Sequence, residues 1–237
     1  PSLEIHKKIG WTYTPGGMSG VPATVNEAKK EICRKYGAVW QGDTSSKKIY
    51  LTMDLGYEYK DHTTRILDIA KEKKFKINFF VTGSPFRTGQ QKDIIARMHR
   101  EGHLVGNHTW GHPSLPGLLE EKGEAQMLLE ITRLENAFFE LTGEKMAKYF
   151  RPPNGEYSEA VMSVLHEHSY TTVFWSFAYR DWLTNDQPDP KTAKELIYKN
   201  LHNGAVLLLH TVSATNIEIL PDLADECRRR GYEISLL

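Results

Sequence analysis

The stretch KKIYLTMDLGYE, residues 47–58, runs from two lysines through an apolar strand pattern to a single acid, Asp54. Short apolar runs rich in β-branched and aromatic residues are typical of buried strands, so the pattern predicts a strand over residues 49–54. In α/β proteins the reactive groups lie at the carboxyl ends of such strands. The residue that follows is Leu55, which has no donor atom for a metal. The stretch therefore predicts a functional edge that carries one carboxylate.

Further strand-like runs alternate with helical segments along the chain. Besides residues 49–54, we expect strands at 77–82, 104–109, 149–151, 171–176, 205–210 and 232–236, and helices at 63–74, 92–101, 120–141, 158–168, 190–201 and 217–230. Strict alternation of strand and helix predicts right-handed crossovers and a parallel sheet, either closed as a barrel or open and doubly wound. The longest expected helix, residues 120–141, has one apolar stripe that would pack on the sheet.

Size and charge restrict the class of protein. The 237 residues fit one α/β domain, and 30 basic residues balance 30 acidic ones. No overall field draws such a chain to nucleic acid or to an anionic membrane. The apolar runs are far shorter than the roughly 20 residues of a transmembrane helix. We expect a monomer, trimmed before Pro1, whose upstream signal or anchor is not in this sequence.

The first 46 residues have a different character from the rest. A Gly-rich opening, WTYTPGGMSGVP, precedes a short helical piece at about residues 24–36, which ends near Gly37. The two cysteines, Cys33 and Cys227, are too few for a disulfide framework and have no CxxC spacing. Whether they bond to each other stays open at this point.

Polar residues of reactive types fall at or just beyond the ends of successive expected strands. They are Asp54, His108, Arg151, Asp181 and His210. Because parallel strands open their carboxyl ends on one side of the sheet, these side chains would face a single mouth. A polar residue whose hydrogen bonds are satisfied inside the core would explain one such strand end. Five reactive residues at five successive strand ends are hard to explain in this way. No phosphate-binding loop, dinucleotide fingerprint or serine elbow competes with this interpretation.

The motif NHTWGHP, residues 107–113, places His108 and His112 four residues apart. This spacing lets two imidazoles reach one metal ion. Histidine pairs at this spacing also arise by chance, and a catalytic zinc site usually has a third protein ligand besides water.

The motif FRPPNG, residues 150–155, puts Arg151 at a strand end and stiffens the following turn with two prolines. The arginine could hold a carboxylate, and a backbone N–H near Asn154 could stabilise an oxyanion. A stiff turn with a surface arginine is the plain alternative.

Two further motifs offer a histidine and its partner. In FWSFAYRDWL, Asp181 could orient a histidine, and Trp182 offers a flat apolar face for a sugar ring, although a structural tryptophan explains it equally well. In AVLLLHTV, His210 stands at the end of an almost wholly apolar strand, and its near-neutral pKa suits a general acid that protonates a leaving amine. A satisfied core histidine explains His210 as readily.

In chain order, TMDLG, HTWGHP, RPPNG, RDW and LLLH resemble the five motifs of the carbohydrate esterase family 4 polysaccharide deacetylases, the NodB homology domain. The segments DLGYE, FFVTG, GNHTWGHP, TVFWSFAYRDW and LLLHTVS are most similar to its muramic-acid deacetylase branch. The resemblance implies a distorted (β/α) barrel of about seven parallel strands. It also implies a single domain, residues 1–237, with residues 1–46 packed as an extension on the core at 47–237.

Carried over by position, the resemblance implies a general base at Asp54, metal ligands at His108 and His112, and a general acid at His210. Arg151 would pair with the catalytic carboxylate or with substrate, and Asp181 would set the proton affinity of the general acid. The residues implied to face the substrate are Trp182, Asn154, Pro153 and Arg180. Arg151 and Arg180 are the candidates to hold the lactyl carboxylate that distinguishes muramic acid.

The sequence departs from the family pattern at Leu55, where the family motif TFDDG has a second aspartate as the third metal ligand. We therefore expect a divalent ion, zinc or similar, that is bound weakly. Asp54 itself, Glu58 in the same loop, or water and substrate could complete its coordination, or the enzyme could work without a tightly held ion.

The implied reaction is hydrolysis of the N-acetyl group of N-acetylmuramic acid in a peptidoglycan glycan strand, outside the cytoplasm, on the way to the muramic δ-lactam of spore cortex. Two alternatives stay open. One is a deacetylase of N-acetylglucosamine polymers, peptidoglycan or chitin, and the other is a catalytically inactive saccharide-binding module.

Overall fold

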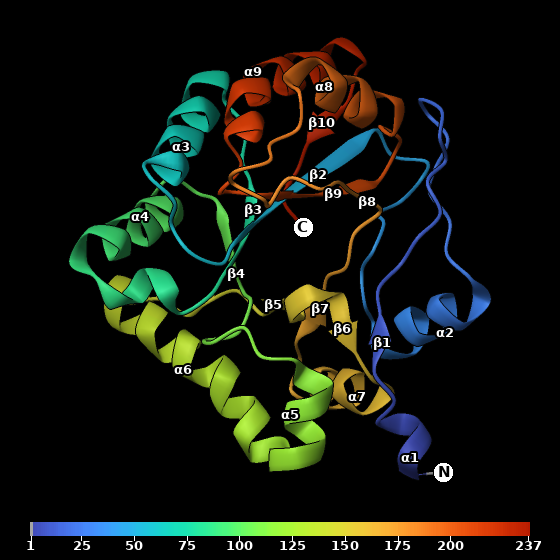
Figure 1. Ribbon diagram of the computed structural model, residues 1–237, viewed down its shortest axis with the longest axis vertical. Helices are drawn as coiled ribbons and strands as arrows, with labels where there is room; N and C mark the ends of the chain where they lie inside the picture. The colour runs from blue at the N-terminus through green and yellow to red at the C-terminus, as the bar shows by residue number, and fades with distance from the viewer. Residues whose placement is uncertain (1) are drawn as a thin grey trace.

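Parallel strands at the centre of the molecule curl into an incomplete barrel, with helices around the outside (Figure 1). In spatial order the strands are β7 (Thr171–Thr172), β5 (Tyr149–Phe150), β4 (Leu104–Asn107), β3 (Asn78–Val81), β2 (Lys48–Leu55), β9 (Ala205–His210) and β8 (Phe177–Ala178). Every pairing along this path is parallel. The computed structural model describes residues 2–237. It confirms the expected distorted barrel of seven parallel strands.

The C-terminal strand β10 (Glu233–Ile234) is an additional member of the sheet. It pairs in parallel with the start of β2, at Lys48 and Ile49, whereas β3 pairs with the end of β2. The Asn78 side chain of β3 links β2 to the end of the chain. Its Nδ2 donates to the carbonyl of Leu51 in β2 and to the carbonyl of Ser235, which follows β10. The end of the chain is thereby fixed next to the central strand.

The helices cover the outer face of the sheet. They are α3 (His62–Lys73), α4 (Gly89–Arg100), α5 (Leu115–Lys122), α6 (Glu124–Thr142), α7 (Glu159–Glu167), α8 (Pro190–Lys199) and α9 (Ala214–Arg229). Along β2, Leu51, Met53 and Leu55 belong to the main core cluster under these helices. Thr52 and Asp54 face the opposite side, since successive side chains of a strand alternate. The strand therefore contributes a core face and a functional face.

The structure corrects two expected elements. The helix expected over residues 120–141 is two helices, α5 and α6, separated at Gly123, whose φ of 90° and ψ of 172° are incompatible with a helix. The strand expected over residues 171–176 ends at Thr172, and β8 begins only at Phe177. Between them Val173 N–H donates to Phe150 O, while Ser176 N–H donates to Val206 O. This segment thus crosses from one edge of the sheet to the other.

The N-terminal 46 residues contain α1 (Ser2–Ile5), β1 (Ile9–Gly10) and α2 (Glu27–Tyr36). The Asn26 side chain caps the start of α2, and Gly37 ends it in the left-handed conformation at φ 64°. Strand β1 pairs antiparallel with β6 (Glu156–Tyr157), which follows the short turn η2 (Pro153–Gly155). The other short turn, η1 (Ser84–Arg87), precedes α4.

Both cysteines are free and buried, in different hydrophobic clusters. Burial raises the pKa of each thiol to about 12. None of the helices in residues 2–237 combines the length and the apolar character that crossing a bilayer requires.

Candidate active site

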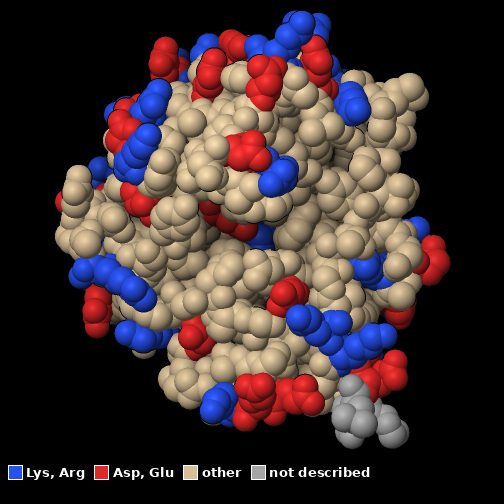
Figure 2. Space-filling view, in the orientation of Figure 1, with Lys and Arg blue, Asp and Glu red and all other residues tan. Residues whose placement is uncertain are grey.

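A groove of about 690 Å³ opens at the carboxyl ends of the central strands. Its lining residues are Asp54, Gly56, Tyr57, His108, His112, Pro152, Asn154, Gly155, Trp175, Ala178, Trp182, Leu208 and His210. On the face in Figure 2, most charged side chains of both signs lie around the periphery, and the centre is hollowed, with a few acidic and basic atoms visible in the hollow. A surface of this kind suits an elongated polar molecule of low charge better than a polyanion.

Asp54 is held from behind by Arg151. The carboxylate Oδ1 accepts a hydrogen bond from Arg151 Nη1 at 2.9 Å, and the side chain of Asp54 is almost fully buried. Burial by itself would raise the pKa of Asp54, but the charge of Arg151, with smaller contributions from His108 and His210, holds it below its usual value. Asp54 is therefore a carboxylate at neutral pH.

The guanidinium of Arg151 has no exposed surface. Its remaining hydrogen bonds go to the Thr52 hydroxyl at 2.8 Å and to the carbonyls of Val173 and Phe174, each at 3.0 Å. Of the two roles implied for Arg151, only the pairing with Asp54 fits these contacts. The prediction that Arg151 could hold a substrate carboxylate is wrong, because every face of the guanidinium is covered by protein.

A tight turn after β4 brings the two histidines together. Thr109 has a φ of 68°, and its hydroxyl accepts a hydrogen bond from the backbone N–H of His112 at 2.9 Å. The rings of His108 and His112 lie 4.9 Å apart between centroids, at 71° to each other. The expected convergence of the pair is therefore present.

The protonation of His108 follows from its partners. Its Nδ1 lies 2.6 Å from the carbonyl oxygen of Arg151, so Nδ1 carries the proton. Burial lowers the pKa of His108 to about 4, with the charge of Asp54 opposing the shift. At neutral pH the unprotonated Nε2 consequently faces Asp54 Oδ2 at 3.5 Å, acceptor against acceptor.

Two facing acceptors of this kind fit a bound cation, and His112 can supply a third donor. Within residues 2–237, however, no cluster of three or more His, Cys, Asp or Glu side chains has the arrangement of a formed metal site. Glu58 does not line the groove, and its Oε1 accepts from the Thr63 hydroxyl at 2.8 Å near the start of α3. Leu55 packs in the core. Asp54, His108 and His112 are therefore the donors that this part of the groove offers to a cation.

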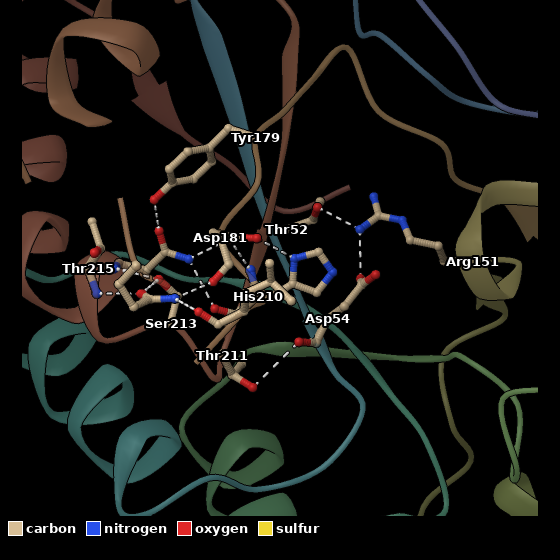
Figure 3. Close-up of polar contacts among 12 residues, drawn as sticks. Thr52, Asp54, Arg151, Tyr179, Asp181, His210, Thr211, Ser213 and Thr215 are labelled. Carbon is tan, nitrogen blue, oxygen red and sulfur yellow. Dashed lines mark hydrogen bonds and ion pairs between the residues drawn. The ribbon is translucent and has the colours of Figure 1, made fainter. Parts of the chain in front are cut away.

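The second half of the groove is built around His210. Its Nδ1 lies 2.7 Å from Asp181 Oδ1, and its backbone N–H donates to Asp181 Oδ2 at 2.8 Å. Figure 3 shows the imidazole with Asp181 on one side and the Asp54–Arg151 pair on the other. Burial lowers the proton affinity of His210, but the hydrogen bond and charge of Asp181 outweigh burial, so the pKa of His210 is raised above its usual value.

Asn216 holds Asp181 in turn, and the sequence analysis missed it. Its Nδ2 donates to Asp181 Oδ2 at 2.7 Å and to the carbonyl of His210 at 3.0 Å, while its Oδ1 accepts from the Tyr179 hydroxyl. Asn216 lies in the first turn of α9, next to the capping Ser213. A polar residue soon after the histidine strand was the available signal, but it is common at any helix start.

The residues expected to face the substrate divide into two groups. Trp182 is 49% exposed and lies with its ring 5.7 Å from that of His210, and Asn154 also lines the groove. Pro153 is buried, and its neighbour Pro152 takes the lining position, so the prediction for Pro153 is wrong by one residue. Arg180 does not line the groove, and its exposed guanidinium lies 3.6 Å from Asp186.

Two aromatic residues of the groove were also missed. Tyr57 is 48% exposed in the loop after β2, and Trp175 lies in the segment that crosses between the sheet edges. The tyrosine in DLGYE was visible as part of a motif, but its direction depends on the loop and could not be inferred from strand alternation.

Comparison with known proteins agrees with this arrangement. The polysaccharide deacetylase family model matches residues 41–173. The chain is 37% identical over 227 residues to the peptidoglycan-N-acetylmuramic acid deacetylase PdaA of Bacillus subtilis, covering 96% of this chain and 83% of that protein. It is 28% identical over 209 residues to a peptidoglycan-N-acetylglucosamine deacetylase of Bacillus cereus, covering 86% and 92%.

The solved structure of Bacillus subtilis PdaA, a family 4 carbohydrate esterase, superposes with a TM-score of 0.89 at 35% identity, covering 97% of this chain and 95% of that chain. The motif order, the barrel and the groove residues agree with these matches. The chain belongs to the polysaccharide deacetylase family.

Proposed function

We propose that this protein hydrolyses the N-acetyl group of N-acetylmuramic acid in peptidoglycan glycan strands. The observation that carries the proposal is the pairing of Asp54 with His210 in one groove. The two residues occupy partner positions on the neighbouring strands β2 and β9, so their side chains leave the sheet on the same side. One is kept ionised by Arg151, and the other is kept protonatable by Asp181.

In the proposed reaction Asp54 accepts a proton from a water molecule, whose oxygen bonds to the acetyl carbonyl carbon. The charge that develops on the carbonyl oxygen is stabilised by the N–H of Asn154 at the groove wall. His210 then donates its proton to the amide nitrogen as the C–N bond breaks. The products are acetate and a free amino sugar.

A divalent ion would be held by Asp54, His108 and His112. When bound, it would polarise the acetyl carbonyl and lower the pKa of water. Because Leu55 contributes no ligand, we propose that the ion is held weakly. His108 suits the ligand role because its Nδ1–H is fixed by the Arg151 carbonyl, which leaves Nε2 free to coordinate.

The choice of muramic acid rests on the higher identity to the muramic-acid relative, and it places the substrate in the cell envelope. A free 2-amino group next to the lactyl carboxylate could close to a δ-lactam, the form found in spore cortex. Tyr57 and Trp182 are the exposed aromatic rings of the groove and would stack on sugar rings. Arg180, outside the groove lining, is the remaining candidate for the lactyl carboxylate.

Acetate release from two matched substrates tests the proposal. One is a peptide-free glycan strand that contains N-acetylmuramic acid, and the other is a chitin oligomer of the same length. We expect release from the first, with mass spectrometry locating the lost acetyl group on muramic acid. Release from chitin alone would assign the protein to the glucosamine deacetylases, and no release from either would support an inactive saccharide-binding module.

A further inference from the structure

We infer that residues 9–13 of the N-terminal extension belong to the catalytic scaffold, with Trp11 and Tyr13 as positioning residues for two walls of the groove. The inference rests on the proposed deacetylation, in which one of these walls supplies the oxyanion donor. It also implies that the extension and the core work as a single domain. Residues 9–13 lie outside the region that the family model matches.

The first wall is the turn at Asn154 and Gly155. These residues have successive left-handed φ values of 58° and 64°. The N–H of Gly155 is used by the carbonyl of Pro152 at 3.0 Å, which leaves the N–H of Asn154 as the amide that this turn can offer to a ligand. Left-handed backbone is uncommon at residues other than glycine, and although asparagine adopts it more readily than most, the surrounding contacts decide how firmly the turn is held.

The N-terminal segment provides that support. The backbone N–H of Trp11 donates to the carbonyl of Gly155 at 2.9 Å. Immediately beyond, Gly10 pairs with Glu156 and Ile9 with Tyr157 in the antiparallel β1–β6 ladder. A Cβ added at Gly155 would lie 2.6 Å from the Trp175 ring and 3.2 Å from Trp11 Cβ, so the turn is enclosed by both tryptophans.

The second wall is formed by Trp175, in the segment that crosses between the sheet edges, and by Ala178, in the strand β8 that follows it. The indole N–H of Trp11 donates to the carbonyl of Trp175 at 2.8 Å, and its ring stacks on Phe174 at 4.3 Å between centroids and 5° between planes. The Tyr13 hydroxyl accepts from the N–H of Ala178 at 2.8 Å and donates to its carbonyl at 3.2 Å.

These contacts replace a missing sheet partner. Between β7 and β8 the crossing segment has no continuous ladder, so its backbone groups need other hydrogen-bond partners. Trp11 contacts both walls, and Tyr13 fixes the second wall at its far end. A shift of either wall by a fraction of an ångström would misplace the oxyanion donor or the sugar ring relative to Asp54 and His210.

The variants Trp11→Phe and Tyr13→Phe test the inference in the full chain. The first removes the indole donor and keeps an aromatic ring, and the second removes only the hydroxyl. The matched control is Tyr36→Phe, which removes a hydroxyl bonded to Glu159 at 2.8 Å in the same aromatic cluster, away from the groove. The measurements are kcat and KM for acetate release, Tm, and amide hydrogen exchange.

We expect kcat to fall roughly tenfold in each of the two variants, with KM little changed, because a transition-state contact is misplaced. Amide exchange should accelerate at residues 154–155 in Trp11→Phe and at residues 176–178 in Tyr13→Phe. The control should keep the wild-type kcat.

A wild-type kcat in both variants, with or without a lower Tm, would show that the contacts are merely structural and would overturn the inference. If the wild-type protein releases no acetate from muramic-acid strands, the proposed function fails by itself. In that case local exchange still decides the positioning role, since unchanged exchange at both walls contradicts it.

Discussion

Asp54 and His210 occupy neighbouring strand ends, yet their pKa values are shifted in opposite directions. Each shift comes from a buried partner of opposite charge, Arg151 for the carboxylate and Asp181 for the imidazole. A base that stays ionised and an acid that stays protonated are thereby available over the same pH range.

The variant Asp181→Asn should move the alkaline limb of the pH–rate profile to lower pH. Wild-type His210 has a raised pKa, so the acid form persists above the usual titration range of histidine and activity falls only as pH rises through that pKa. Removing the charge of Asp181 lowers the pKa of His210, and we expect a shift of roughly one pH unit or more. An alkaline limb at the wild-type position would show that another group supplies the proton.

Leu55→Asp restores the family's usual residue at this position, but we expect it not to create a metal ligand. The Leu55 side chain is 1% exposed and packs in the core on the face of β2 opposite Asp54. A buried unpaired carboxylate there should cost about 3–5 kcal/mol of unfolding free energy. Chemical denaturation of Leu55→Asp, with Leu55→Met as the volume-matched control, measures this. A stable Leu55→Asp variant with tighter metal binding would contradict it.

That Asp54, His108, Asp181 and His210 would lie near one another was predictable from the sequence, because each of them ends or follows a recognisable strand. The partners that hold these residues in place were less accessible. Arg151 could have turned outward toward substrate, and only the carbonyls of Val173 and Phe174 show that it turns inward. Asn216 reaches Asp181 from a different element, a contact that no local pattern encodes.

Among the elements, long apolar strands matched their predictions best. The boundaries of β9 agree with the expected residues 205–210, and β2 differs from the expected 49–54 by one residue at each end. The predictions fail where the sequence pattern of a helix or strand continues but the backbone leaves that conformation. Gly123 divides the expected helix 120–141 ahead of its apolar stripe, which lies wholly in α6, and residues 173–176 keep strand-like composition while leaving one sheet edge for the other.

The short turn η2 gives a test at the level of elements. Gly155→Ala places a Cβ at a φ of 64° and 2.6 Å from the Trp175 ring, so the turn must shift. We expect kcat for acetate release to fall at least tenfold, in line with a displaced oxyanion donor. Steady-state kinetics measures this directly.

Gly143→Ala is the matched control for that variant. Gly143 has a φ of 75° at the end of α6, and a Cβ there would meet no atom within 4 Å. Both variants should lose about 1 kcal/mol of stability through backbone strain. Equal kcat values for the two variants would contradict a role of the turn in catalysis.

In the whole molecule, the features hardest to predict are those that join distant parts of the chain. The parallel sheet and the shared mouth follow from the alternation of strands and helices. The hydrogen bonds from Trp11 and Tyr13 to residues 155–178 span more than 140 positions, and nothing in the Gly-rich opening indicates their partners. Such contacts form only where the folded barrel brings the N-terminal segment next to these later residues.

Metal removal is a test of the assembled site. Dialysis against a chelator should abolish most acetate release, and added zinc should restore it. For the weak site that we propose, removal of the ion should lower Tm by only a small amount. An ion that remains at one equivalent through dialysis, or activity that survives its complete removal, would contradict a weak and functional site.

The most direct measurement compares acetate release from peptide-free muramic-acid strands by the wild-type protein, Asp54→Asn and His210→Gln, with circular dichroism to verify folding. We expect the wild-type protein to release acetate and each folded variant to be slower by about 10²–10⁴-fold, as expected when a general base or a general acid is lost. Wild-type rates in either variant would contradict the assignment of Asp54 and His210 as the base and acid of one groove.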